Sequence, residues 1–156
     1  MPVKPIPDGY HTATPYLIIK GAAEAIEFYK RAFDATELVR MPGPDGAVMH
    51  AEIKIGDSPM MLADEFPEMG ALSPKTIGGT PIVLMLYLEK VDEVFARAIA
   101  AGAKELRPVQ NQFYGDRSGT LEDPFGHKWT IATHIEDLTP EEMEQRMAAM
   151  KPEGCS

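Results

Sequence analysis

Two stretches of the sequence decide the fold because they repeat one pattern. Residues 16–38 read YLIIKGAAEAIEFYKRAFDATEL, and residues 84–106 read LMLYLEKVDEVFARAIAAGAKEL. At a constant offset of 68 residues, Ala32, Ala35, Glu37 and Leu38 meet identical residues in the second stretch. Self-similarity at a fixed spacing is the signature of a repeated structural unit. The sequence therefore predicts two copies of one module.

Each copy places a helix after its first strand. Apolar residues recur at helical spacing over residues 22–33 in the first copy and over residues 91–101 in the second. Gly102 follows the second helix where a C-cap glycine belongs. Strands are expected after each helix, separated by Gly- and Pro-containing turns, at residues 37–40, 47–55, 59–63, 105–109, 118–122 and 128–133. Each module thus reads βαβββ.

The fold class that follows is α+β: two βαβββ modules forming a curved mixed sheet with a central cavity. We expect a single domain over residues 1–156, with module one at about 12–64 and module two at about 81–135. Residues 65–80 form a polar linker that crosses the surface or covers a pocket as a lid. A short C-terminal helix is predicted at about 139–150, because Thr139 to Glu142 make a capping box with proline at the first helical position.

Composition narrows the function classes. A net charge of −9 over 156 residues is the wrong sign for binding a phosphate backbone, so no nucleic-acid partner is expected. No apolar run approaches the ~20 residues that cross a bilayer, and prolines stand where a signal peptide needs an apolar run, so no membrane partner is expected. A single cysteine, Cys155, excludes an internal disulfide, and we expect a cytoplasmic protein.

The end of the second module carries a resemblance to a known family. A pair of βαβββ modules that closes on DPFGHKW, residues 123–129, resembles the vicinal oxygen chelate superfamily, which includes glyoxalase I, extradiol dioxygenases, fosfomycin-resistance enzymes and bleomycin-binding proteins. The resemblance covers about residues 14–134. Four runs look like its PhnB-like branch: TPYLII, AIEFYKRAF, MPGPDGAVMHAEIKIGDSPMMLADE and YGDRSGTLEDPFGHKWTIATHIEDLTPEE.

This resemblance implies helices on the outside of each curved sheet and a ligand cavity on the inside. In metal-dependent relatives four positions on the inside bind a divalent ion, usually through His or Glu. Here these positions fall on Thr14, on Met60 or Met61, on Ile82 or Val83, and on Thr130. None of these side chains is a histidine or a carboxylate. We therefore expect no metal site and no cofactor, although a metal at an unusual site stays an alternative.

Period-two alternation sorts the faces of the strands. In residues 47–55, Met49, Ala51, Ile53 and Ile55 are expected to lie under the helix, which sends His50, Glu52 and Lys54 to the cavity. In the last strand, Trp129 and Ile131 are expected under the helices. The residues predicted to bind the ligand are Thr14, Tyr16, Glu52, Met61, Tyr87, Tyr114, Arg117 and Thr130.

His50 is the candidate acid or base, since its unperturbed pKa lies near neutrality and Glu52 shares its face about 7 Å along the strand. A strand histidine with a carboxylate neighbour is more often a satisfied structural pair, and this interpretation stays open. Arg117 is a candidate for holding a carboxylate or phosphate, or it forms a salt bridge with Asp116, Glu122 or Asp123.

Two functions remain open from the sequence. The first is a metal-free protein that binds a small, partly apolar ligand between its modules, for sequestration or resistance. The alternative is an enzyme of lyase, isomerase or dioxygenase type, metal-independent or with an atypical metal site, using His50 as acid or base. A homodimer is expected, because Met143, Met147 and Met150 give the terminal helix an apolar stripe that a partner subunit can cover.

Overall fold

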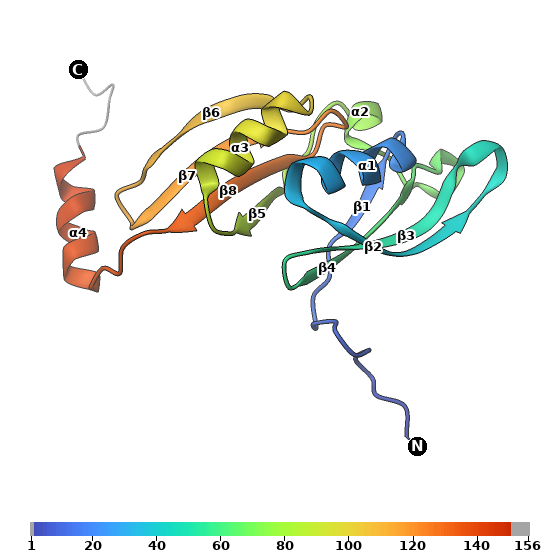
Figure 1. Ribbon diagram of the computed structural model, residues 1–156, viewed down its shortest axis with the longest axis horizontal. Coiled ribbons are helices and arrows are strands. Elements are labelled where there is room, and N and C mark those ends of the chain that lie inside the picture. The colour runs from blue at the N-terminus through green and yellow to red at the C-terminus, as the bar shows by residue number, and fades with distance from the viewer. Residues whose placement is uncertain (1, 151–156) are drawn as a thin grey trace.

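Each copy of the repeat folds into a four-stranded mixed sheet with one long helix across it (Figure 1). The structure, a computed structural model, describes residues 2–150, so Cys155 lies outside the described residues. Module one contains β1 (Tyr16–Ile19), α1 (Ala22–Phe33), β2 (Thr36–Pro42), β3 (Val48–Ile55) and β4 (Ser58–Asp64). Module two contains β5 (Val83–Tyr87), α3 (Val91–Ala100), β6 (Lys104–Asn111), β7 (Asp116–Glu122) and β8 (Lys128–His134).

The strand order is the same in both modules. It runs β1-β4-β3-β2 in the first sheet and β5-β8-β7-β6 in the second. The first and last strands of each module pair in parallel, and the remaining pairs are antiparallel. The α+β fold class is therefore confirmed. Within residues 2–150, however, the two sheets do not close into a barrel.

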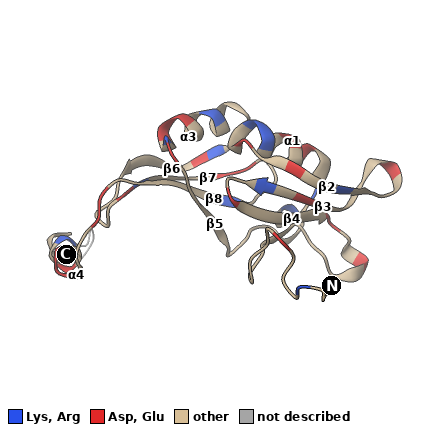
Figure 2. Cartoon of the chain, turned by 60° about the horizontal axis from the view of Figure 1, so that its bottom comes forward, with Lys and Arg blue, Asp and Glu red and all other residues tan. Residues whose placement is uncertain are grey.

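Helices α1 and α3 lie side by side on the same face of the two sheets (Figure 1). Their inner faces form one core with the strands, and its largest fully buried side chains include Phe28, Tyr29 and Trp129. Their outer surfaces carry both signs of charge (Figure 2). Within residues 2–150, no helix packs across the opposite face of the two sheets. We call it the open face, and its strand residues include Tyr16, His50, Glu52 and Met61 in module one and Val83, Met85, Tyr87, Thr120 and Thr130 in module two.

One buried carboxylate joins the modules. Asp123, in the turn between β7 and β8, accepts hydrogen bonds from the Tyr29 hydroxyl at 2.6 Å and from Trp129 Nε1 at 2.9 Å. Its other oxygen accepts the backbone N–H groups of Phe125 and His127, so it caps its own turn. Burial and the neighbouring Asp123 raise the pKa of Tyr29 well above its ordinary value. A carboxylate this deeply buried is tolerated because every partner is satisfied.

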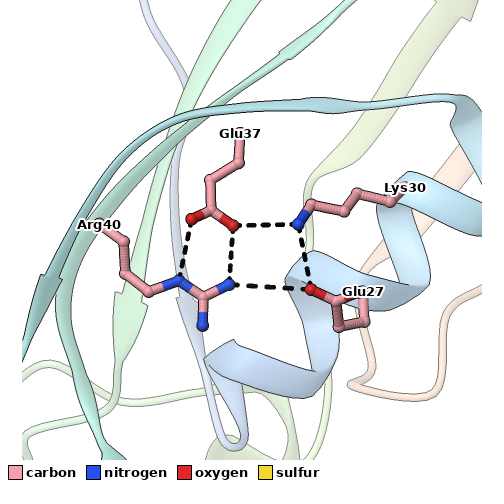
Figure 3. A network of polar contacts seen from close by, with 4 residues as sticks. All are labelled: Glu27, Lys30, Glu37 and Arg40. Carbon is pink, nitrogen blue, oxygen red and sulfur yellow. Dashed lines mark hydrogen bonds and ion pairs between the residues drawn. The ribbon is translucent and has the colours of Figure 1, made fainter.

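An ion-pair network fastens α1 to β2 on the outside of module one (Figure 3). Glu37 accepts from Arg40 at 2.8 Å and from Lys30 at 3.1 Å, and Glu27 closes the network. The Arg40 guanidinium, followed by the Lys30 ammonium, lowers the pKa of Glu37. Exposed pairs of this kind contribute only a few tenths of a kcal/mol each, about 0.2–1.

The alternation predicted for β3 is correct except at its start. Ala51, Ile53 and Ile55 are buried under the helix, but Met49 is 66% exposed and Val48 is buried in its place. The register against β2 slips here, because Met41 pairs with His50 while Pro42 pairs with Val48. This bulge turns Met49 outward, and Val48 N–H donates to Asp64 Oδ2 at 2.7 Å.

The linker holds two short helical turns, η2 (Pro67–Met69) and α2 (Pro74–Ile77), while η1 (Pro44–Gly46) lies in the β2–β3 turn. The last helix, α4 (Pro140–Ala149), has the predicted capping box at Thr139 and Glu142. It stands away from both sheets (Figure 1), and none of its residues is buried. Between residues 2 and 150 no helix is both long and apolar enough to span a membrane.

Candidate functional site

A chain of four polar side chains crosses the open face of module one. The Tyr16 hydroxyl on β1 lies 2.8 Å from His50 Nδ1 on β3, and His50 Nε2 lies 3.1 Å from Glu52 Oε1 on the same strand. Tyr10, from the segment before β1, donates its hydroxyl to the other Glu52 oxygen. The open face therefore brings together the predicted residues Tyr16, His50 and Glu52 and adds Tyr10, which the sequence did not indicate.

The protonation pattern of this chain follows from its carboxylate. Hydrogen bonds from Tyr10 and then from His50 lower the pKa of Glu52, so it is an ionised acceptor. Burial and the same carboxylate raise the pKa of Tyr10 to about 12, so Tyr10 is a neutral donor. In the neutral imidazole, Nε2–H then donates to Glu52 and Nδ1 accepts from Tyr16, an assignment made from the network. Both ring nitrogens of His50 are therefore hydrogen-bonded, one to Tyr16 and the other to Glu52.

Apolar surface surrounds this polar chain. Met61 on β4 is the register partner of both Tyr16 and Glu52, so these three side chains form one row across the sheet. Tyr16 is 46% exposed, and its ring packs 5.5 Å from the ring of His50. Thr14 is half-buried just before β1. This half of the open face combines the Tyr16 ring and the Met61 thioether with the hydrogen-bonded polar groups of Tyr10, Tyr16, His50 and Glu52.

Module two presents a polar hollow of about 220 Å3 on its own open face. Two predicted residues, Tyr114 and Thr130, line it, and the Thr130 hydroxyl lies 2.9 Å from the Thr120 hydroxyl. The remaining lining residues are Arg107, Gln110, Gln112, Ser118, Gly119 and Thr120. The glutamines fall in the amide- and aromatic-rich run at residues 110–114. Arg107 and Thr120 were not predicted from the sequence as lining residues. Period-two alternation, followed from Thr130 and along β7, would have indicated Thr120.

The predicted residue Tyr87 belongs to a different cluster at the far end of β5. Its hydroxyl donates to Asp116 Oδ2 at 2.7 Å, and His134 Nδ1 lies 2.8 Å from Asp116 Oδ1. His134 Nε2 also lies 2.8 Å from Asp137. Hydrogen bonds to Asp116 and then Asp137 raise the pKa of His134. No local pattern could have shown this cluster, because its members come from separate elements.

Arg117 does not lie on the open face, contrary to the sequence prediction. Its guanidinium binds both carboxylate oxygens of Asp92 on α3, at 2.7 and 2.8 Å, and also Asn111. Residues 117, 119 and 121 share one face of β7, and Leu121 on that face is fully buried in the core. Arg117 therefore fastens β7 to the helix layer. The salt bridge that was the alternative does form, but with Asp92 rather than with Asp116, Glu122 or Asp123.

The central cavity expected between the modules is open within residues 2–150. Met85 and Tyr87, on β5 of the open face, are both exposed. A groove of about 690 Å3 does separate the modules at one end, with Asp34, Lys54 and Asp57 on one wall and Tyr87 and Arg97 on the other. Of the predicted binding residues, Tyr87 alone is among those lining this groove.

The donor set at the four family metal positions does not fit a divalent cation. β5 places Val83 and β4 places Met61 on the open face, and Thr130 is bonded to Thr120. The nearest stronger donors, His50 and Glu52, are engaged with each other and with two tyrosines. Among residues 2–150, no three His, Cys, Asp or Glu side chains are grouped so that they could hold a metal ion.

Comparison with known proteins decides the family. A model of the Glyoxalase/Bleomycin resistance protein/Dioxygenase superfamily matches residues 10–131. The chain belongs to this superfamily. A Mycobacterium bovis protein is 40% identical to this superfamily member over 144 residues, which cover 90% of this chain and 93% of that protein.

Solved structures of the superfamily share the fold. TioX from Micromonospora is 25% identical, with a TM-score of 0.63 over 83% of this chain and 100% of TioX. The PhnB protein of Bacillus cereus is 21% identical, with a TM-score of 0.59 over 79% and 99% of the two chains. FosX, a fosfomycin resistance protein of Listeria monocytogenes solved with Mn(II) and sulfate, is 20% identical, with a TM-score of 0.61 over 88% and 97%.

Proposed function

We propose that this superfamily member is a PhnB-like protein that binds a small, partly apolar ligand on its open face without a metal ion, as a sequestering or resistance protein. One observation carries the proposal: both ring nitrogens of His50 are hydrogen-bonded, so the histidine holds Tyr16 in place. The Tyr16 hydroxyl donates to His50 and leaves its oxygen lone pairs facing the open surface as an acceptor. Few oriented polar groups on an apolar wall are typical of small-molecule sites.

The metal-free part of the proposal rests on the donor chemistry at the four family positions. A thioether, a valine and two threonines cannot replace the nitrogen and carboxylate ligands that divalent ions prefer. The Mn(II) ion complexed with FosX belongs to that protein. The PhnB-like assignment rests on the runs shared along residues 14–142. A cytoplasmic location is part of the same proposal, because a chain with one cysteine uses no internal disulfide.

Native mass spectrometry of the purified protein tests this function. We expect wild type to retain a small organic compound, and Tyr16→Phe and His50→Ala to retain less of it. Lys54→Gln is the matched control, because Lys54 lies on the same strand but is exposed and lines the groove instead. The proposal fails if wild type retains no compound and no aromatic probe shifts the NMR signals of β1, β3 or β4.

A catalytic role is the second candidate, favoured by the contact between His50 and Glu52. In this role Tyr16 takes a proton from the ligand while its own hydroxyl proton passes to His50 Nδ1, which leaves the imidazole protonated. Both groups are within hydrogen-bond distance, so the geometry permits the transfer. Turnover of the retained compound that His50→Ala abolishes, while binding persists, would establish it. Binding with no chemical change in wild type leaves the sequestering function alone.

A homodimer completes the proposal. The open face exposes Tyr16, Met85 and Tyr87, and α4 and its C-cap expose Met147 and Met150. A ten-residue helix with no buried side chain is marginal in isolation, so it gains stability from a partner surface. Sedimentation analysis should give twice the mass of one chain. Met147→Glu together with Met150→Glu should shift the protein toward the monomer if α4 lies in the interface.

A further inference from the structure

Arg107 is placed on the open face of module two by an irregularity in β6. The register against β7 shifts on both sides of it, between Glu105 and Arg107 and between Arg107 and Gln110. Gly119 on β7 permits this path: a Cβ at Gly119 would lie 2.9 Å from Val109 Cγ2 and 3.1 Å from Val109 N. Bulges of this kind re-aim a side chain beside a binding site. Here the bulge aims Arg107 into the polar hollow.

The hollow around Arg107 is lined, among the residues that the structure describes, by hydrogen-bond donors and by no carboxylate. The hollow is lined by three residues with hydroxyl groups, Tyr114, Thr120 and Thr130, and by the amide side chains of Gln110 and Gln112. Within residues 2–150 the Arg107 guanidinium makes no ion pair or hydrogen bond, a property it shares with Arg31 on α1, whereas the other four arginines are each bonded to a neighbour. A chain with net charge −9 has ample carboxylates to neutralise it. The Arg107 guanidinium is therefore available to bind an anion on the face proposed to bind the ligand.

The size of the hollow matches a single chemical group. Its volume of about 220 Å3 is below the ~300–1,000 Å3 of a pocket that encloses a whole drug-sized ligand. A carboxylate or phosphonate group with its first carbon atoms fits such a space. The apolar remainder of the molecule then lies outside the hollow, on the open face.

We propose that the ligand of the open face is an organic oxyanion, a carboxylate or a phosphonate, whose charged group is bound bidentately by Arg107 in this hollow. The inference rests on the proposed binding function and names its ligand class. Arginine is suited to the task because its planar fork donates two parallel hydrogen bonds to such an anion. Thr120 and Thr130 lie beside it, and because only one of their two hydroxyls donates within the pair, the other O–H is free to donate to the anion.

NMR titration with three probes tests the anion, following the amide signals of Thr120 and Thr130. Benzoate and phenylphosphonate carry the two anions, and benzyl alcohol is the neutral analogue. We expect either anion to bind wild type at least about tenfold more tightly than benzyl alcohol, and Arg107→Gln to remove that difference. Arg107→Lys should recover part of it, because lysine keeps the charge and loses the fork. The anion that binds more tightly identifies the class.

Arg31→Gln is the matched control, because Arg31 is an exposed arginine on α1, on the opposite face. It should leave all three affinities unchanged. Equal binding of benzoate, phenylphosphonate and benzyl alcohol, unaffected by Arg107→Gln, overturns the anion inference and leaves the binding function intact. If none of the three probes shifts any open-face signal, the binding function and the anion inference both fail. Unchanged amide spectra of the free variants confirm that each is folded.

Discussion

The two modules share their element order and strand order, yet their open faces carry different chemistry. Beneath the helices the repeat is preserved: the matched residues Ala35 and Ala103 are 9% and 8% exposed, and Ile26 and Val94 are both buried. On the open face, module one offers a histidine, a carboxylate and two tyrosines, whereas module two offers hydroxyls, amides and an arginine. Packing constrains the helix-covered side of a duplicated sheet, and the uncovered side is free to differ between the two modules.

The largest expected effect comes from breaking the contact that makes the two modules one core. Asp123→Ala leaves the buried Tyr29 hydroxyl and Trp129 Nε1 without an acceptor, so it should lower the free energy of unfolding by about 3–5 kcal/mol. Tyr29→Phe removes one of these hydrogen bonds and should cost only about 1–2 kcal/mol. Urea unfolding measures both. A loss no greater in Asp123→Ala than in Tyr29→Phe contradicts the central role of the carboxylate.

Gly119→Ala tests whether the bulge in β6, opposite Gly119, is what places Arg107 on the open face of module two. The added Cβ would lie 2.8 Å from Phe95 Cε2 on one side and 3.1 Å from the Val109 backbone on the other. Overpacking of this kind should destabilise the protein by about 1–3 kcal/mol and shift the NMR signals around Arg107. Gly46→Ala is the control: it has free space but a positive φ, so it should cost about 1 kcal/mol and leave the hollow unchanged. Equal shifts at Arg107 in both variants would count against the bulge argument.

The two modules also differ in how a histidine is hydrogen-bonded. His50 in module one contacts a tyrosine and a glutamate, whereas His134 in module two contacts two aspartates. His134 contacts two carboxylates, which raise its pKa, so its contribution to stability is complete below pH 6.5 and is lost as the pH rises through the folded pKa. Asp137→Asn should lower the pKa of His134 while the contact with Asp116 remains. NMR titration of the imidazole protons measures the change. A His134 pKa that is the same in Asp137→Asn as in wild type would falsify the assignment of Asp137.

The smallest effect is expected at Arg117. Its pair with Asp92 lies at the surface, with the two side chains 35% and 60% exposed, so Arg117→Gln should leave the melting temperature nearly unchanged. Since Arg117 lies on the helix-covered side, its loss should also leave benzoate and phenylphosphonate binding unchanged. Thermal unfolding and an NMR titration with the two anions measure these quantities. A loss of anion affinity matching that of Arg107→Gln would return Arg117 to the ligand site.

The repeat made most of the fold predictable, because helical and period-two patterns report which side chains lie under the helices. Helix α1 begins and ends at the predicted residues, and α3 ends one residue earlier than expected. The alternation failed at Met49 because a bulge moves the residues on its far side to the other face, and a bulge leaves no periodic signal in the sequence. Arg117 lies on the helix-covered side because it shares that face of β7 with the buried Leu121.

The candidate site was less predictable because its contacts are distant in sequence. His50 and Glu52 share a strand, and their proximity follows from the pleat. Tyr10 reaches Glu52 across 42 residues from a segment without periodicity, and Arg107 depends on a bulge opposite Gly119. A pattern over a few residues indicates which face of a strand or helix each side chain lies on. They carry no information on which distant side chain fills the remaining space.

The hydrogen bond from Tyr29 to Asp123 joins residues 94 positions apart, and the linker at residues 65–80 adds no strand to either sheet. The linker therefore acts as a tether that holds the two modules of one chain at a high effective concentration. Cleavage at Gly70, an exposed glycine at the end of η2, would turn that intramolecular association into a bimolecular one. The two fragments should reassemble in a concentration-dependent way, because the contact between Tyr29 and Asp123 forms only when both halves meet.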